Sequence, residues 1–214
     1  MSVKKKLSII IVLPVFALAC VCPVTGPTNP NDTPDSATHT PTPTVTPTTV
    51  FSCPPASPPI PDWPVYCNDT YEFYAQYPPD AVVGTTDFNF IHFDLPFVPD
   101  TNLSEKYVEI TVQQTTDTCE SQLAEGIPPE MLEIENEVIN GINFSKTSGS
   151  DAGVGNYWEW ITYITGRDNI CVKLKLVLHS TNPLNYPTPP PEFDFNLEVA
   201  SFEQMVESFS WYTP

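Results

Sequence analysis

A proline- and threonine-rich segment restricts where this chain can fold. Residues 23–64 contain 13 of the chain's 26 prolines, and threonine is nearly as frequent there. Proline lacks a backbone N–H donor and holds φ near about −65°, so a packed core cannot form in this segment. We expect an extended, semi-rigid spacer, with a PxxP ligand for a partner protein as the alternative. Residues 66–214 are then enough for one globular domain with a single core.

The residues ahead of this segment are typical of an export signal. Lys4–Lys6 precede a mostly apolar run over residues 7–19, which is shorter than the roughly 20 residues of a membrane-spanning helix. Ala17-Leu18-Ala19-Cys20 resembles the lipobox of bacterial lipoproteins, in which the cysteine is lipidated and becomes the N-terminus. This resemblance predicts a signal peptide over residues 1–19 and a lipid on Cys20. The alternative is an ordinary cleaved signal.

The charge of the chain excludes one class of partner. The sequence has 8 Lys+Arg against 26 Asp+Glu, a formal net charge of −18. Three basic residues and no acidic residue lie in the predicted signal, so the mature chain would carry 5 minus 26, or −21. This charge repels phosphate groups, so we expect no nucleic-acid partner. Anionic lipid head groups are repelled as well, and we expect membrane contact through the lipid on Cys20.

The cysteines predict disulfide bonds, because an exported chain enters an oxidising compartment. Besides Cys20, the sequence contains Cys22, Cys53, Cys67, Cys119 and Cys171. Cys22, next to the predicted anchor, is our candidate for an unpaired residue. We predict the pairs Cys53–Cys67 and Cys119–Cys171, among the three connectivities that four cysteines allow. No CxxC motif or Cys/His cluster indicates zinc, and we expect no metal and no cofactor.

Alternation of apolar and polar residues predicts strands in the domain. The clearest is 170–179, where every second residue from Ile170 to Leu178 is apolar. Such a half-buried strand should lie at the centre of the sheet. We expect further strands at 71–77, 87–95, 108–112 and 157–165.

A β-hairpin is predicted around Asn140-Gly141, which is the strongest short signal for a two-residue turn. The flanking strands are residues 132–139 and 142–147. A two-residue turn sets Ile139 across from Ile142 and Glu135 across from Lys146.

The C-terminal part of the sequence has helical periodicity. Apolar residues recur at spacings of four and three, at Phe195, Val199, Phe202, Val206 and Phe209. Asp194 is placed to cap this amphipathic helix, and a second short helix is predicted at residues 119–126. The expected fold class is α+β, with a single antiparallel β-sheet and the C-terminal helix packed on it.

The layout of export signal, tether over residues 20–65 and compact domain is that of many uncharacterised bacterial surface lipoproteins. Within the domain, Tyr71–Pro79 and Phe202–Trp211 resemble the PsbP-like family. In that family an aromatic strand leads to Tyr-Pro, and a closing helix ends near Ser-Phe. Pro79-Asp80 stands here in place of the usual Gly-Trp. The resemblance implies an antiparallel sheet between helices and an auxiliary or binding role, and it carries over no functional residue.

Two histidines are candidates for chemistry in the domain. His92 and Asp94 lie two residues apart on one strand face, as a metal or acid/base pair could. His179-Ser180 could supply a base and a nucleophile. Surface histidines of a sheet are the alternative in both cases. The motifs GxSxG, HExxH and the EF-hand loop are absent from the sequence, and we assign no catalytic residue.

Two tryptophans are candidates for sugar binding. Trp158 and Trp160 share one face of a predicted strand, as a stacking platform for sugar rings requires, with core packing as the alternative. The acidic residues between Glu130 and Glu137 could bind Ca²⁺ or form a solvated strand face. Together with Trp158 and Trp160, the residues predicted to bind a ligand are His92, Asp94 and His179.

The sequence thus indicates a lipid-anchored domain on the extracytoplasmic face of a cell-envelope membrane, with a non-catalytic binding or envelope-assembly role. Its ligand would be an unknown protein or carbohydrate. One alternative is an extracellular hydrolase that uses His92 and Asp94, or His179. The other is a secreted, glycosylated eukaryotic domain, because Asn-x-Ser/Thr sequons begin at Asn31, Asn68, Asn102 and Asn143.

Overall fold

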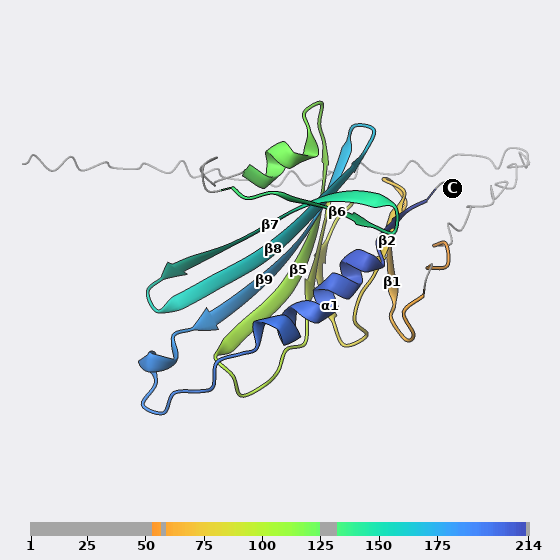
Figure 1. Cartoon of the computed structure of the whole chain (residues 1–214). Helices are drawn as coiled ribbons and strands as arrows, with labels where there is room; N and C mark the ends of the chain where they lie inside the picture. Colours follow the sequence, from red (N-terminus) through yellow and green to blue (C-terminus); the bar gives the residue numbers. More distant parts are fainter. Residues whose placement is uncertain (1–52, 57–58, 125–131, 213–214) are drawn as a thin grey trace, which may run out of the picture. The chain divides into compact units, whose positions relative to one another are not determined.

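The computed structural model describes residues 53–56, 59–124 and 132–212 (Figure 1). The predicted signal peptide, Cys20, Cys22 and residues 21–52 of the predicted tether lie outside the described residues. Among the residues that are described, no helix is long and apolar enough to cross a membrane.

Antiparallel strands dominate the described residues and form two sheets. The larger sheet has the strand order β3-β4-β5-β9-β8-β7-β6, and the smaller has the order β1-β2-β10. The seven strands of the larger sheet are β3 (Val82–Thr86), β4 (Phe90–Asp94), β5 (Leu103–Gln114), β6 (Glu135–Ile139), β7 (Ile142–Gly153), β8 (Asn156–Arg167) and β9 (Ile170–Thr181). The three strands of the smaller sheet are β1 (Val65–Asn68), β2 (Phe73–Gln76) and β10 (Ser210–Trp211).

This arrangement shows that the predicted fold class was wrong. The chain does not form a single sheet with a packed helix: the described residues are mostly β, in two sheets, with one α-helix, α1 (Phe195–Glu207). The predicted strand 71–77 pairs outside the larger sheet, with β1 and with the two residues of β10. Ser210 lies across from Tyr74, far away in the sequence. A two-residue strand has no periodicity, so the sequence pattern gave no sign of this sheet.

The predicted hairpin is confirmed with its register. Ile139 pairs with Ile142, and Glu135 pairs with Lys146. Asn140 and Gly141 have φ values of 50° and 79°, the left-handed conformation that a type I′ turn requires at both positions.

The predicted central strand is confirmed as well, because β9 is the fourth of the seven strands. Val172, Leu174, Leu176 and Leu178 are buried at its inner face and belong to the main core. Their burial explains why this strand has the clearest alternation in the sequence.

Helix α1 begins as predicted after Asp194, whose Oδ1 accepts hydrogen bonds from the N–H groups of Asn196 and Leu197. Phe202, Met205 and Val206 are buried where the helix packs over β9 and β2. The helix covers one face of the larger sheet, the inner face (Figure 1). We call the opposite face the outer face.

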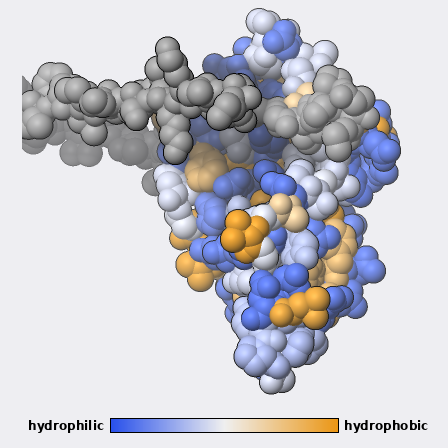
Figure 2. Space-filling model, turned by 90° about the vertical axis from the view of Figure 1, so that its left-hand side faces the viewer, coloured by the Kyte–Doolittle hydropathy of each residue, from blue (hydrophilic) through white to orange (hydrophobic). Residues whose placement is uncertain are grey.

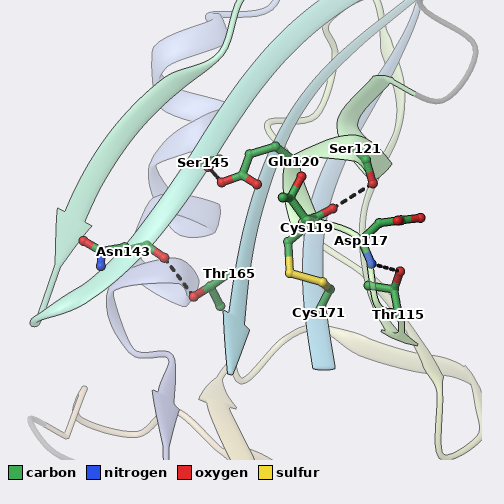
Figure 3. The surroundings of a disulfide bond; sticks show 10 residues. Thr115, Asp117, Cys119, Glu120, Ser121, Asn143, Ser145, Thr165 and Cys171 are labelled. Atoms are coloured by element: carbon green, nitrogen blue, oxygen red, sulfur yellow. Dashed lines mark hydrogen bonds between the residues drawn. A yellow bond between two sulfur atoms is a disulfide. The ribbon is translucent and has the colours of Figure 1, made fainter. Parts of the chain in front are cut away.

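Both disulfides join the cysteines that were paired from the sequence. Cys53 bonds Cys67, with Cα atoms 5.9 Å apart, and Cys119 bonds Cys171, with Cα atoms 5.6 Å apart. The second bond holds a 3₁₀ helix, η1 (Cys119–Ala124), against β9 (Figure 3). Most of the predicted short helix is thus 3₁₀, and its last two residues lie outside the described part. Leu123 packs on Ile164 and Cys171, so η1 covers one end of the outer face.

Candidate functional site on the outer sheet face

All five predicted ligand-binding residues lie on the outer face of the larger sheet. In β8, Ile161 and Tyr163 belong to the core, so the alternating residues Trp158 and Trp160 point outward. The same alternation in β4 and β9 turns His92, Asp94 and His179 outward, since their neighbours along each strand are core residues. Trp158, Trp160 and His179 lie on the consecutive strands β8 and β9, whereas His92 and Asp94 lie on β4, two strands from β9 in the same sheet.

The ring of Trp158 is stacked on that of His179. Their centroids are 4.8 Å apart, and the ring planes differ by 5°. The two residues are direct cross-strand partners in β8 and β9. His179 Nδ1 lies 3.0 Å from Glu105 Oε2, and its Nε2 lies 3.1 Å from Asn156 Oδ1. With both ring nitrogens and one ring face engaged, His179 holds the indole of Trp158 in a defined orientation.

Trp160 lies over Gly149 on the neighbouring strand β7. A Cβ atom at Gly149 would come within 2.5 Å of the indole Cζ2 atom and within 2.8 Å of Cε2. Only glycine therefore allows the indole to approach the sheet so closely. Lys175 Nζ lies 5.8 Å from the centroid of the same ring, within range of a cation–π contact.

His92 forms a second group on this face, two strands away from His179. Its Nε2 lies 3.1 Å from Asp94 Oδ1, and its Nδ1 lies 3.8 Å from Glu109 Oε1. Its ring is stacked on Tyr107, with centroids 4.8 Å apart. Burial, and then the charges of Glu109 and Glu105, raise the pKa of the Tyr107 hydroxyl. Tyr107 therefore keeps its proton at neutral pH and can donate a hydrogen bond.

The outer face includes four residues that were not predicted as ligand-binding from the sequence. Tyr107 stacks on His92, Glu105 and Asn156 contact His179, and Lys175 contacts Trp160. The alternation of side chains along β5 places Glu105 and Tyr107 on the face that points away from the core residue Val108. The sequence pattern therefore indicated on which side of the sheet these two residues lie. Their proximity to the tryptophans depends on strand order and register, which the sequence did not show.

The arrangement separates one of the two pairs proposed from the sequence, His179 and Ser180, and keeps His92 and Asp94 in contact. Ser180 is buried on the inner face, whereas its neighbour His179 points outward, so the predicted base and nucleophile are on opposite faces. Asp94 is largely exposed beside His92, with 64% of its side-chain surface accessible. Over the described ranges, no group of three or more His, Cys, Asp or Glu side chains is arranged to hold a metal ion.

The acidic run is only partly described, because Glu130 lies outside the described residues. Glu135 and Glu137 alternate in β6 on the inner side, where Glu137 Oε1 lies 3.3 Å from Lys146 Nζ. Within the described residues this run forms a charged strand face paired with one lysine.

The two disulfides indicate an oxidising, extracytoplasmic compartment. Such bonds are rare in the reducing cytosol, and each of these closes a loop at the periphery of the core.

Comparison with known proteins gives structural likenesses only. No family model and no curated protein matches the sequence. A protein from Bacteroides thetaiotaomicron matches with a TM-score of 0.46 and 13% identity, covering 70% of this chain and 48% of its own length. The Saccharomyces cerevisiae Ran-binding protein Mog1p matches with a TM-score of 0.48 and 8% identity, and the match covers 70% of this chain and 95% of Mog1p.

A third solved structure, the Pseudomonas aeruginosa protein of unknown function PA94, matches with a TM-score of 0.40 and 13% identity. It covers 71% of this chain and 98% of its own length. This chain thus spans about half the length of the Bacteroides protein and nearly all of the other two. None of these likenesses assigns a function to it.

Proposed function

We propose that this chain is a lipid-anchored extracytoplasmic module that binds carbohydrate, without catalysis, through the outer sheet face. The observation that carries the proposal is the placement of two half-buried tryptophans, Trp158 and Trp160, side by side on that face. Each indole is held by a specific neighbour, His179 or Gly149. Rings that are fixed in advance lose little conformational entropy when a ligand binds.

The chemistry of the face suits a sugar better than an apolar ligand. A pyranose ring has an apolar C–H face that packs on an indole, and hydroxyl groups around its edge. Glu105 and Asn156 contact His179 beside Trp158, Lys175 contacts Trp160, and Tyr107 lies on the same face two strands from Trp160. Together these side chains offer both donors and acceptors. A few polar groups around aromatic rings are the usual composition of a specific small-molecule site.

The anchor rests on the lipobox resemblance at Cys20, and the oxidising compartment supports export. A diacylglyceryl group on the mature N-terminal cysteine would give durable membrane attachment, because two acyl chains bind far more strongly than one. Mass spectrometry of the mature N-terminus tests this part. The proposal requires a lipidated Cys20, and an unmodified cysteine or cleavage elsewhere contradicts it.

Two of the sequons argue against the secreted eukaryotic alternative. Asn68 and Asn102 are buried, and their Nδ2 groups donate to the carbonyl oxygens of Phe88 and Thr181. A glycan on either nitrogen would remove that hydrogen bond and could not fit inside the fold. Asn143 is exposed and could carry one. A chain made in the eukaryotic secretory pathway would have to leave two of these three sites unmodified.

Co-sedimentation with insoluble peptidoglycan, chitin and cellulose tests the carbohydrate proposal. We expect the wild-type protein to bind at least one of them, and Trp158→Ala and Trp160→Ala to weaken binding at least about tenfold each. Phe88→Ala is a matched control, because Phe88 is a 64% exposed aromatic residue in the turn between β3 and β4. Equal loss in the control, or no binding by the wild type, would argue against the proposal.

A further inference from the structure

A cavity of about 810 Å³ lies on the inner face, at the start of β8 and beside the start of α1. Tyr157 and Glu159 line it from the strand, while Glu192, Phe193 and Phe195 line it from the segment that leads into the helix. Tyr157 and Glu159 alternate with the outward-pointing Trp158 and Trp160. The cavity is therefore separated from the proposed sugar site by the thickness of the sheet.

The charge of this cavity has one sign. The described residues that line it include Asp151, Glu159 and Glu192 and no Lys, Arg or His. Glu159 and Glu192 make no side-chain hydrogen bond or ion pair with any other described residue. Glu159 is moreover half-buried, so its carboxylate is partly shielded from water. Unpaired carboxylates at a shielded, concave surface attract a cation more strongly than exposed ones do.

Aromatic rings are available in the same cavity. Tyr157 and Phe195 are 41% and 36% exposed, although both are large side chains that could be buried. Phe193, which also lines the cavity, packs against the main core. Rings next to carboxylates can hold the apolar stem and the charged end of a lysine or arginine side chain together.

An apolar rim adjoins the cavity. Val154 is fully exposed at the β7–β8 turn, and Leu184 is 83% exposed in the 3₁₀ helix η3 (Pro183–Asn185). Gly155 O accepts hydrogen bonds from Asn182 N and Asn185 Nδ2, so the turn and η3 are joined. Asn182 and Pro183 line the cavity as well. Viewed from the side of the β7–β8 turn, the surface shows separate hydrophobic patches among hydrophilic residues (Figure 2).

Val154 is an unfavourable residue for its turn. Its φ is 52°, a left-handed conformation that β-branched residues rarely adopt and that Asn or Gly adopts easily. A strained and fully exposed valine contributes nothing to the core, and its side chain is free to contact another molecule.

We propose that the cavity and this rim form a docking surface for a basic, extended segment of a partner protein. A lysine or arginine side chain of the partner enters between the carboxylates of Glu159 and Glu192 and the rings of Tyr157 and Phe195. Apolar side chains of the same segment pack on Val154 and Leu184. Charge complementarity selects this occupant: an acidic or purely apolar segment would leave the unpaired carboxylates buried without a partner.

The test uses the full-length mature protein and a fluorescein-labelled octapeptide of alternating lysine and leucine, with binding followed by fluorescence anisotropy. Because the whole chain is acidic, a charge-matched control is essential. We expect Glu159→Gln/Glu192→Gln to weaken binding about tenfold or more. Asp80→Asn/Asp117→Asn removes the same charge from exposed positions elsewhere and should change the affinity less than about twofold. Equal losses in both pairs would mean unspecific attraction and overturn the proposal.

Two further variants distinguish peptide docking at this surface from binding elsewhere on the domain. Val154→Asn should weaken peptide binding and keep or raise the melting temperature, because the turn strain is relieved. Unchanged affinity in that variant would overturn the role of the rim. Trp158→Ala should leave peptide binding unchanged, so failure here and failure of the carbohydrate proposal are distinguishable. If spermidine binds as tightly as the peptide, the cavity is a site for small amines, and the peptide proposal is wrong.

Discussion

Lys106 Nζ lies 3.0 Å from Glu198 Oε2 in a fully buried ion pair, with 4% and 2% of the two side chains exposed. Lys106 lies on the inner face of β5 and Glu198 in the first turn of α1. The second carboxylate oxygen of Glu198 accepts a hydrogen bond from Val98 N, 2.8 Å away. One polar contact thus joins the helix, the sheet and the loop before β5.

Breaking this pair from one side should be costly. Lys106→Met leaves the carboxylate of Glu198 buried without its partner, and we expect a loss of about 3–5 kcal/mol in the free energy of unfolding. Lys106→Met/Glu198→Gln removes both charges and keeps an acceptor for Val98 N, so it should recover most of that loss. Urea unfolding followed by circular dichroism measures both values. A double variant as unstable as the single one would contradict this account.

The two disulfides should contribute unequally to stability. Cys119 and Cys171 are 52 residues apart and Cys53 and Cys67 are 14 apart, so the first bond closes the longer loop. The chain-entropy model gives about 4 kcal/mol for the longer loop and about 3 kcal/mol for the shorter one. Thermal unfolding of Cys119→Ser/Cys171→Ser and Cys53→Ser/Cys67→Ser tests the order. Greater destabilisation by the second pair of substitutions would show that loop length does not dominate.

Glu120 should make stability depend on pH at the acidic end. A hydrogen bond from its own backbone N–H lowers the pKa of its carboxyl group; partial burial opposes this, and hydrogen bonds from Ser145 and Thr118 add to it. A lowered pKa in the folded state means that the unfolded chain binds a proton first. The contribution of the Glu120 carboxylate to the free energy of unfolding is therefore complete above about pH 4.5, and it is lost as the pH falls through the folded-state pKa.

Melting temperatures between about pH 2 and 6 measure this effect. The decline on acidification should be shallower for Glu120→Gln than for the wild type. Ser145→Ala, which removes one donor to Glu120 (Figure 3), should change the slope in the same direction by less. An identical pH profile for wild type and Glu120→Gln would contradict the role of these hydrogen bonds.

Local sequence signals predicted the local features of the fold. The Asn140-Gly141 turn has a left-handed requirement that few residues meet, and Asp194 has a capping side chain directly before a helical stripe. The alternation in β9 follows from its burial at the centre of the sheet. Each of these features depends on residues close together in the sequence, where propensity and pattern act directly.

Features that depend on distant pairing could not be predicted. The smaller sheet forms only when β10 pairs with β2, which lies more than 130 residues earlier in the sequence. Strand β3 is exposed along its whole length and shows no alternation. Lys106 occupies the same strand face as Val108, where a charged residue is unexpected, and its partner Glu198 is 92 residues away. The outer face was predicted only in part for the same reason. That Trp158 and Trp160 share a strand face follows from their spacing in the sequence, whereas their neighbours on β5 and β9 depend on how the strands pair.

Gly149 provides the most direct test of the proposed carbohydrate site, because Gly149→Ala displaces the Trp160 ring without removing it. The measurement is co-sedimentation with whichever of the three polysaccharides the wild type binds, comparing wild type and Gly149→Ala, with Gly153→Ala at the end of the same strand as control. A Cβ at Gly153 meets no atom closer than 3.9 Å. We predict a loss of at least about tenfold for Gly149→Ala and wild-type binding for Gly153→Ala. Undiminished binding by folded Gly149→Ala would contradict the claim that the outer face holds the sugar.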